Sequence, residues 1–239
     1  MKLKKPIKII LGVIIFITLP TLLLFGFAYF KYHEPLPIGT KGAKADNLAT
    51  KMLIALNYEA YRNTDYIEWT FKNKRHYNWE KAKHKCDVLW KEYKVKLDFN
   101  DHSKSKAYVH GFTISGEKGK ELVDQALDYF ENDIFWLIAP YQVFDEGVTR
   151  EFVTLPSSQK GLLVNYSENE TYLWKIDSSG LPTSFQMWGN KTPIDGLEAT
   201  WNDWTFVATG AKFPTFHKLL FFGFELTDLE ATAPKDPKS

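Results

Sequence analysis

Residues 171–204 read TYLWKIDSSGLPTSFQMWGNKTPIDGLEATWNDW, and this stretch decides the predicted fold. In its first segment Tyr172, Trp174 and Ile176 alternate with their neighbours, which is the period-2 pattern of a β-strand with two unlike faces. A Ser-Ser-Gly turn follows, and Pro182 begins the next strand, where its missing N–H costs least. Such a hairpin needs further strands on both sides before it is stable, so the stretch predicts a larger antiparallel sheet.

Further alternating segments lie on both sides of this stretch. The pattern changes from helical to alternating at Tyr66, and short polar links join the segments that follow into a meander. After residue 204, two more strands are predicted at 212–220 and 221–229. In total the sequence predicts ten or eleven strands, and it shows no internal repeat of fixed period.

Two amphipathic helices are predicted to pack on the sheet. Around residues 45–56 the apolar side chains recur with helical spacing on one stripe, and Asp46 is the expected N-cap. The stripe consists of Ala45, Leu48, Ala49, Met52, Leu53 and Leu56. The second helix is expected over 119–132, and it leads into an apolar run at 134–139 that Pro140 ends. That run is interpreted either as a plug for one end of the sheet or as a lid over a cavity.

The N-terminal segment has the features of a membrane anchor. Residues 9–30 carry no charge over 22 positions, and as a helix they would reach about 33 Å, enough to cross a hydrocarbon core. The first 31 residues hold five lysines and no acid, mostly before the apolar run, so residues 1–8 are expected in the cytoplasm and the domain on the other side. Because no small-residue cleavage pattern follows, an uncleaved signal anchor is expected over 1–31.

The rest of the chain is divided by composition. A linker with several prolines and glycines is expected over 32–45, a single domain over 46–230, and a disordered charged tail over 231–239. Of the 30 basic residues, 25 remain beyond the anchor, against 29 acidic ones. This slightly negative balance argues against a nucleic-acid-binding domain.

The sequence contains few groups that would carry catalysis. The lone Cys86 excludes an intramolecular disulfide and a thiolate metal cluster. The six histidines have no metal-ligand spacing, and the common hydrolase, phosphate-loop and zinc-protease motifs do not occur. No catalytic residue, metal or cofactor is therefore predicted.

Aromatic side chains are the candidate binding residues. A curved sheet with only two helices has few layers with which to cover so much inward aromatic surface, which favours a lined cavity over a solid core. On the hairpin we expect Tyr172, Trp174, Ile176, Phe185 and Met187 to face inward and Trp188 to lie on the opposite face. The predicted lining of the cavity consists of Trp69, Phe71, Tyr77, Trp79, Val88, Trp90, Leu97, Phe99, Phe135, Trp136, Trp174, Phe185 and Met187. The alternative is that these residues form an ordinary core.

The order of these elements resembles the LolA-like superfamily of lipoprotein carriers and related envelope proteins. The resemblance rests on a strand ending in Asp177, a short polar turn and the Leu181-Pro182 step that begins the next strand. Four longer pieces, at 57–71, 76–83, 135–148 and 196–204, resemble an uncharacterised bacterial envelope family within that superfamily. The resemblance implies an unclosed antiparallel β-barrel, with helices as a plug or lid over an apolar cavity for acyl chains.

Three functions follow from these observations. The leading hypothesis is a single-pass protein of the bacterial inner membrane whose periplasmic domain binds, without catalysis, a lipid or the acyl chain of a lipoprotein. The first alternative is an envelope scaffold module with a solid core. The second is a hydrolase acting on glycan or lipid, which would need an aromatic cleft with two facing carboxylates near Trp201 or Trp204.

Overall fold

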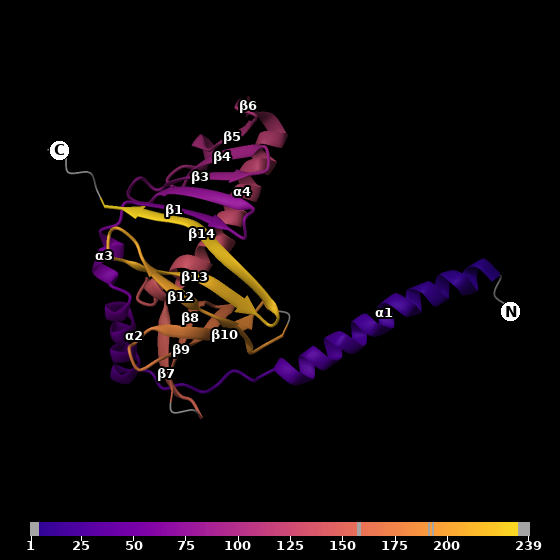
Figure 1. The fold of residues 1–239 in the computed structure, drawn as a ribbon, viewed down its shortest axis with the longest axis horizontal. Coiled ribbons are helices and arrows are strands. Elements are labelled where there is room, and N and C mark those ends of the chain that lie inside the picture. The colour runs from indigo at the N-terminus through magenta and orange to yellow at the C-terminus, as the bar shows by residue number, and fades with distance from the viewer. Residues whose placement is uncertain (1–4, 157–158, 191, 193, 234–239) are drawn as a thin grey trace.

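A computed structural model describes residues 5–156, 159–190, 192 and 194–233 of the chain. In this part of the chain fourteen strands form one antiparallel sheet, and helix α1 projects away from it (Figure 1). The helices are α1 (Lys5–Tyr32), α2 (Ala43–Ala55), α3 (Tyr58–Arg62) and α4 (Gly116–Ile138). The strands are β1 (Tyr66–Phe71), β2 (Arg75–Glu80), β3 (Lys85–Trp90), β4 (Tyr93–Asp98), β5 (Lys106–Val109), β6 (Phe112–Ile114), β7 (Thr149–Thr154), β8 (Lys160–Ser167), β9 (Glu170–Ile176), β10 (Pro182–Gly189), β11 (Leu197–Thr200), β12 (Asn202–Phe206), β13 (Lys212–Leu219) and β14 (Phe222–Thr232).

The sheet consists of two meanders joined through the first and last strands. Its order is β6-β5-β4-β3-β2-β1-β14-β13-β11-β10-β9-β8-β7, with β12 paired to β13 beside this path. The join is the antiparallel pairing of β1 with β14, from Tyr66 opposite Thr232 to Phe71 opposite Leu226. Strands β6 and β7 do not pair with each other, so the barrel is unclosed, as the resemblance to the LolA-like superfamily implies.

The structure contains more strands than the ten or eleven expected. Strands β6, β7 and β8 were not anticipated, and the segment 196–204 divides into β11 and β12. Strand β8 escapes a search for alternation because four successive residues, 161–164, are all buried. A strand covered on both faces loses the period-2 signal, and only its partners in the folded chain identify it.

The second face of β8 is covered because a small cluster lies on the outer side of the sheet. This cluster consists of Val153, Leu163, Leu173 and Trp188, all buried. Trp188 thus lies on the face opposite Tyr172, Trp174, Ile176 and Phe185, which belong to the main core, as expected from the hairpin. The two faces of β7–β10 are therefore both apolar.

Helix α4 lies across the concave face of the sheet (Figure 1). Its buried residues include Leu122, Ala126 and Phe130 from the predicted stripe. The apolar run expected to follow the helix is its last turn and a half, and a 3₁₀ turn at Ala139–Gln142 with Pro140 near its start comes directly after. One longer helix therefore fills much of the concavity.

Helix α2 buries the predicted stripe, but it begins earlier than expected. The helix starts at Ala43, and its N-cap position is Gly42 without a side-chain cap. The expectation that Asp46 is the N-cap is wrong: its Oδ1 instead accepts a hydrogen bond from Arg150 Nε at 3.0 Å. The interaction with a distant strand, rather than local capping, accounts for this acidic residue.

Helix α1 is long and apolar enough to cross a membrane. The span Ile7–Tyr32 has a mean hydropathy of 2.6, and none of its most apolar window is buried against the rest of the protein. At the other end of the chain β14 extends to Thr232, two residues into the segment expected as a tail. Residues 234–239 of that expected tail lie outside the described residues.

Candidate functional site

Helix α4 is fixed to the sheet by a buried carboxylate. Asp133 is fully buried and accepts hydrogen bonds from Arg75 Nε at 2.5 Å and Nη2 at 2.9 Å, both from strand β2. The hydroxyl of Tyr77 donates a third at 2.6 Å. Burial, followed by the neighbouring carboxylate, raises the pKa of Tyr77, so its hydroxyl keeps its proton and remains a donor. The buried pair therefore sets where α4 crosses the sheet.

A groove lies between the C-terminal half of α4 and strands β8–β10. Its volume is about 380 Å³, within the range of small-molecule sites. The residues that line it are Glu131, Asn132, Ile134, Phe135, Trp136, Gln142, Tyr166, Glu170, Tyr172, Phe185 and Met187. Polar side chains are confined to a few of these positions, so most of the wall is apolar.

The floor of the groove is a set of packed aromatic rings. The ring centroid of Phe135 lies 4.8 Å from that of Tyr172 and 5.7 Å from that of Phe185. Trp136 packs against Phe185 at 5.6 Å. Phe135 and Trp136 are half-buried, and Met187 is also half-buried beside them. The groove therefore exposes apolar surface on side chains that neighbouring rings hold in place.

One polar contact holds the wall of the groove in place. The hydroxyl of Tyr166 donates to the carbonyl of Ala139 at 2.8 Å and accepts from Trp174 Nε1 at 3.0 Å. Burial raises the pKa of Tyr166, so this hydroxyl stays neutral. Strand β8 is thereby tied both to the end of α4 and to β9.

The predicted lining residues divide between the groove and the core. Phe135, Trp136, Phe185 and Met187 line the groove. The other nine lie in the main core, where α4 covers much of the concave face; they are Trp69, Phe71, Tyr77, Val88, Trp90, Leu97 and Trp174, which are buried, and Trp79 and Phe99, which are partly buried. The sequence placed all thirteen on the inner side, but only the position of α4 separates groove from core.

Several groove residues were not among those predicted. The alternation of the hairpin predicts Tyr172 on the inward face, but the predicted lining of the cavity does not name it. Its place on the same face as Phe185, which it contacts, is the signal that would have added it to the lining. Tyr166 lies on β8, a strand that the alternation did not reveal. The rim residues Glu131 and Glu170 are polar, and no local pattern marks them.

The part of the groove beside Met187 lies across the sheet from the start of the domain, which contacts the outer face of β10. Met187 pairs with Tyr172 on one side, and its carbonyl accepts from the amide of Gly196 at 2.9 Å on the other. The carbonyl of Asp195 in turn accepts from the amide of Glu34 at 2.9 Å, two residues beyond the end of α1. The groove and the attachment of α1 therefore share one end of the sheet.

A larger hollow elsewhere has a lining of mixed polarity. It has a volume of about 590 Å³ and lies between β5, β6 and the N-terminal half of α4. Its lining includes Ser103, Lys106, Thr113, Lys120 and Asp124. Tyr108, Ile114, Val123 and Leu127 also line it, but only one of these side chains is aromatic. The smaller groove has five Phe, Trp or Tyr side chains in its lining and is therefore the better candidate for an apolar ligand.

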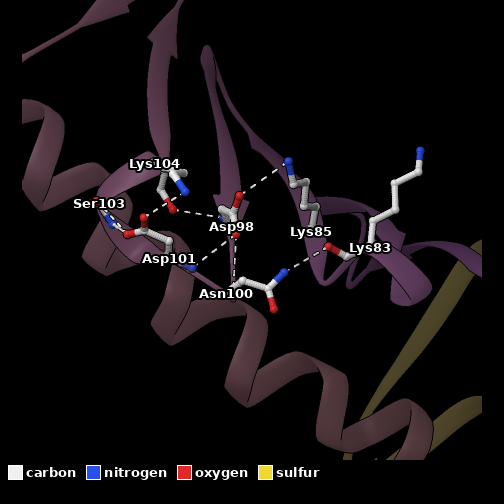
Figure 2. A network of polar contacts seen from close by, with 8 residues as sticks. Lys83, Lys85, Asp98, Asn100, Asp101, Ser103 and Lys104 are labelled. Carbon is white, nitrogen blue, oxygen red and sulfur yellow. Dashed lines mark hydrogen bonds and ion pairs between the residues drawn. The ribbon is translucent and has the colours of Figure 1, made fainter.

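The carboxylates beside this hollow hold a loop. Figure 2 shows Asp98 Oδ1 accepting from the amides of Asn100 and Asp101, at 3.1 and 3.2 Å. Lys85 Nζ lies 3.4 Å from Asp98 Oδ2. Desolvation would raise the pKa of Asp98, but these donors outweigh it and lower the pKa. This network stabilises the link between β4 and β5.

The arrangement expected for a hydrolase was two carboxylates facing an aromatic cleft near Trp201 or Trp204. Trp201 is fully buried and offers no surface to a substrate. Trp204 Nε1 donates to the carbonyl of Pro182 at 3.1 Å. Among the described residues no group of three or more His, Cys, Asp or Glu side chains could hold a metal ion.

Comparison with known proteins gives similarity of fold only. No protein-family model and no curated protein matches the chain. The crystal structure of a LolA superfamily protein from Nitrosomonas europaea is similar at 9% identity and a TM-score of 0.40, over 80% of this chain and 95% of that one. The structure of an outer membrane lipoprotein-sorting protein domain from Vibrio parahaemolyticus is similar at 12% identity and a TM-score of 0.36, over 80% and 96% of the two chains.

Proposed function

We propose that this protein is anchored by α1 in the bacterial inner membrane, with its domain in the periplasm, and that the groove beneath α4 binds the acyl chain of a lipid or lipoprotein without catalysing a reaction. The observation that carries the proposal is the position of an apolar groove at the end of the sheet from which the membrane helix leaves. An acyl chain leaving the bilayer at that end has the shortest path to the groove.

The lining of the groove suits a long apolar ligand. Burial of apolar surface contributes about 25 cal/mol per Å², and the aromatic floor around Phe135 and Phe185 offers such surface in an ordered form. Met187 adds a flexible side chain that adapts to ligand shape. Glu131 and Asn132, both exposed at the rim, would contact a polar head group.

The charge of the N-terminal flank supports the proposed orientation. Lys2, Lys4, Lys5 and Lys8 precede the apolar span, and positively charged flanks remain in the cytoplasm. Tyr29 and Tyr32 at the other end of α1 suit the opposite membrane interface. The domain begins directly after them.

The binding proposal is tested by photo-crosslinking in the full chain. The protein is reconstituted in phospholipid vesicles that contain a diazirine fatty acid, irradiated, digested and sequenced by mass spectrometry. We expect labelled peptides from α1, which serve as an internal standard, and labelled peptides that contain Phe135 and Met187. Labelling of α1 alone would contradict the proposal.

Two variants make the test specific for the groove. Met187→Trp replaces a thioether chain in the half-buried wall with a larger indole ring that fills part of the groove. We therefore expect several-fold weaker labelling at Phe135. Ile54→Trp makes a comparable change at a side chain that is 74% exposed on α2 and outside the groove, and labelling should stay at the wild-type level. Equal labelling of the two variants at Phe135 would show that the groove is not the site.

A further inference from the structure

The hairpin between β13 and β14 ends in exposed aromatic side chains. Phe221 is 72% exposed and Phe222 is 63% exposed, with their ring centroids 4.1 Å apart. The groove does not include either residue. Two adjacent exposed phenylalanines form an apolar tip that nothing in the described chain covers.

The residues of this turn are unlike those that hairpins usually contain. Leu220 has a φ of 56°, a left-handed conformation that is unfavourable for a bulky residue. Tight hairpin turns normally use Gly, Asn or Asp at such positions. A turn built from Leu220, Phe221 and Phe222 thus keeps apolar side chains at the tip against local preference. An apolar environment outside the domain would account for this.

Strand register places the tip beside the attachment of α1. Ala199 of β11 pairs with Leu219 of β13 in antiparallel fashion, so the residues before β11 run alongside the tip. Those residues include Asp195, whose carbonyl accepts from the amide of Glu34 at 2.9 Å. Figure 1 shows the β13–β14 hairpin pointing to the side from which α1 leaves.

The connection to the membrane helix is short. Helix α1 ends at Tyr32, and Glu34 is already bonded to the domain. Two residues span at most about 7 Å, so a bilayer crossed by α1 begins close to this end of the sheet. The hairpin tip is therefore held near the lipid head groups.

Basic side chains surround the tip. Lys72 and Lys74 lie in the turn between β1 and β2, where the amide of Lys72 donates to the carbonyl of Glu225 on β14. Lys218 is exposed near the end of β13. The ion pairs recorded among the described residues do not involve any of these three lysines. Glu225 on β14 lies beside these lysines, whereas Asp195 and Glu198, the latter paired with Lys175, lie along β11 on the other side of the tip. The cationic side chains therefore gather on the side of the tip that faces the β1–β2 turn.

We propose that the β13–β14 hairpin is a second membrane contact, in which Phe221 and Phe222 insert among the acyl chains of an anionic bilayer while Lys72, Lys74 and Lys218 meet lipid phosphates. This inference rests on the membrane anchoring by α1 proposed above, and it is independent of what the groove binds. The hairpin and α1 together would hold the domain with the Met187 end of the groove toward the bilayer.

The test uses the full chain with a fluorophore at the tip. Phe222→Cys is labelled with an environment-sensitive nitrobenzoxadiazole dye and reconstituted in vesicles of phosphatidylethanolamine and phosphatidylglycerol. The native Cys86 is only 1% exposed, and the unsubstituted chain serves as the labelling blank. We expect the dye at position 222 to emit at shorter wavelength and with several-fold higher intensity than the same dye at a position exposed to water. We also expect lipids that carry a spin label on the acyl chain to quench this emission.

Phe206→Cys is the matched control. Phe206 is 68% exposed, but it pairs with Lys212 at the start of β13, the opposite end of the sheet. The emission of the dye at position 206 should be that of a dye in water, and lipids spin-labelled on the acyl chain should not quench it. Lys74→Glu with Lys218→Glu should reduce the quenching at position 222 several-fold.

The outcomes separate the two proposals. A chain that does not float with vesicles overturns both the anchor and the hairpin contact. A chain that floats but shows the same aqueous emission at positions 222 and 206 overturns the hairpin contact alone. If the emission at position 222 rises with the number of protein molecules per vesicle and spin-labelled lipids do not quench it, two copies of the protein pair at the hairpin. This outcome also overturns the hairpin contact with the membrane.

Discussion

At the scale of single residues, His217 is an ionisable group that the fold buries completely. It is fully buried on β13, with its ring centroid 4.4 Å from that of Trp201 and 5.1 Å from that of Trp136. Its Nδ1 lies 3.2 Å from the carbonyl of Thr200, and Nε2 has no hydrogen-bond partner in the described part of the chain. Burial lowers the pKa of His217 to about 4. The folded protein therefore contains a neutral imidazole.

This histidine predicts a loss of stability in mild acid. The unfolded chain binds a proton near pH 6.5 and the folded chain only near pH 4, so the free energy of unfolding falls between these values, by about 3 kcal/mol from this group. His217→Phe should remove that part of the pH dependence, whereas His102→Gln, at an exposed histidine, should leave it unchanged. Urea unfolding of the full chain in mild detergent, followed by tryptophan fluorescence at neutral pH and near pH 4, measures the difference. Equal acid sensitivity of His217→Phe and the wild type would contradict the assignment.

At the scale of elements, the segment between α1 and α2 is a strap along the outer face of the sheet. Glu34 accepts from Gln186 Nε2 through its side chain and from Trp188 Nε1 through its carbonyl, each at 2.8 Å. Thr40 forms a β-bridge with Phe152 on the edge strand β7. The strap covers the outer cluster and protects an otherwise open edge. It therefore couples the direction of α1 to the sheet.

Gly196 provides a specific way to displace this strap. A Cβ at Gly196 would lie 2.6 Å from Glu34 Cβ and 2.9 Å from its amide nitrogen. We expect Gly196→Ala to raise hydrogen exchange at Glu34 and to speed tryptic cleavage at Lys41. Gly111→Ala is the matched control, because Gly111 also has a positive φ of 86° but its Cβ would meet no atom within 4 Å. Similar exchange at Glu34 in both variants would show that the strap does not depend on this close approach.

At the scale of the whole molecule, the domain has an end from which α1 leaves and an opposite end. The hairpin tip and the start of the strap lie at the first, together with the part of the groove beside Met187, while α2, α3 and the end of β14 lie at the other (Figure 1). The pairing of β1 with β14 makes both meanders one rigid sheet, so this polarity holds across the full domain.

The lysine-rich flank before α1 predicts a membrane topology that cysteine labelling measures. A membrane-impermeant maleimide added to intact spheroplasts should label Phe206→Cys, because this exposed position lies in the domain proposed to be periplasmic. Lys2→Cys, before the apolar span, should be labelled only after lysis. The reverse pattern would place the domain in the cytoplasm.

The correct part of the prediction came from patterns that are local in the chain. The stripe of α2, the alternation of β9 and β10 and the inward aromatic set depend on spacing alone, because helices and strands repeat at fixed periods. Strand β8 was missed because burial on both faces removes its alternation. Asp46 was misassigned because its partner, Arg150, is 104 positions away in the sequence.

The sequence by itself determined an apolar N-terminal helix, an antiparallel sheet and an aromatic inner face. Only the tertiary structure decided which inner residues form a groove, since that depends on where Asp133 fixes α4 against Arg75 and Tyr77. It also decided that the groove, the hairpin tip and the base of α1 share one end of the sheet, because that depends on strand register between distant segments. Periodicity reports which face of an element is apolar, but long-range contacts decide what that face meets.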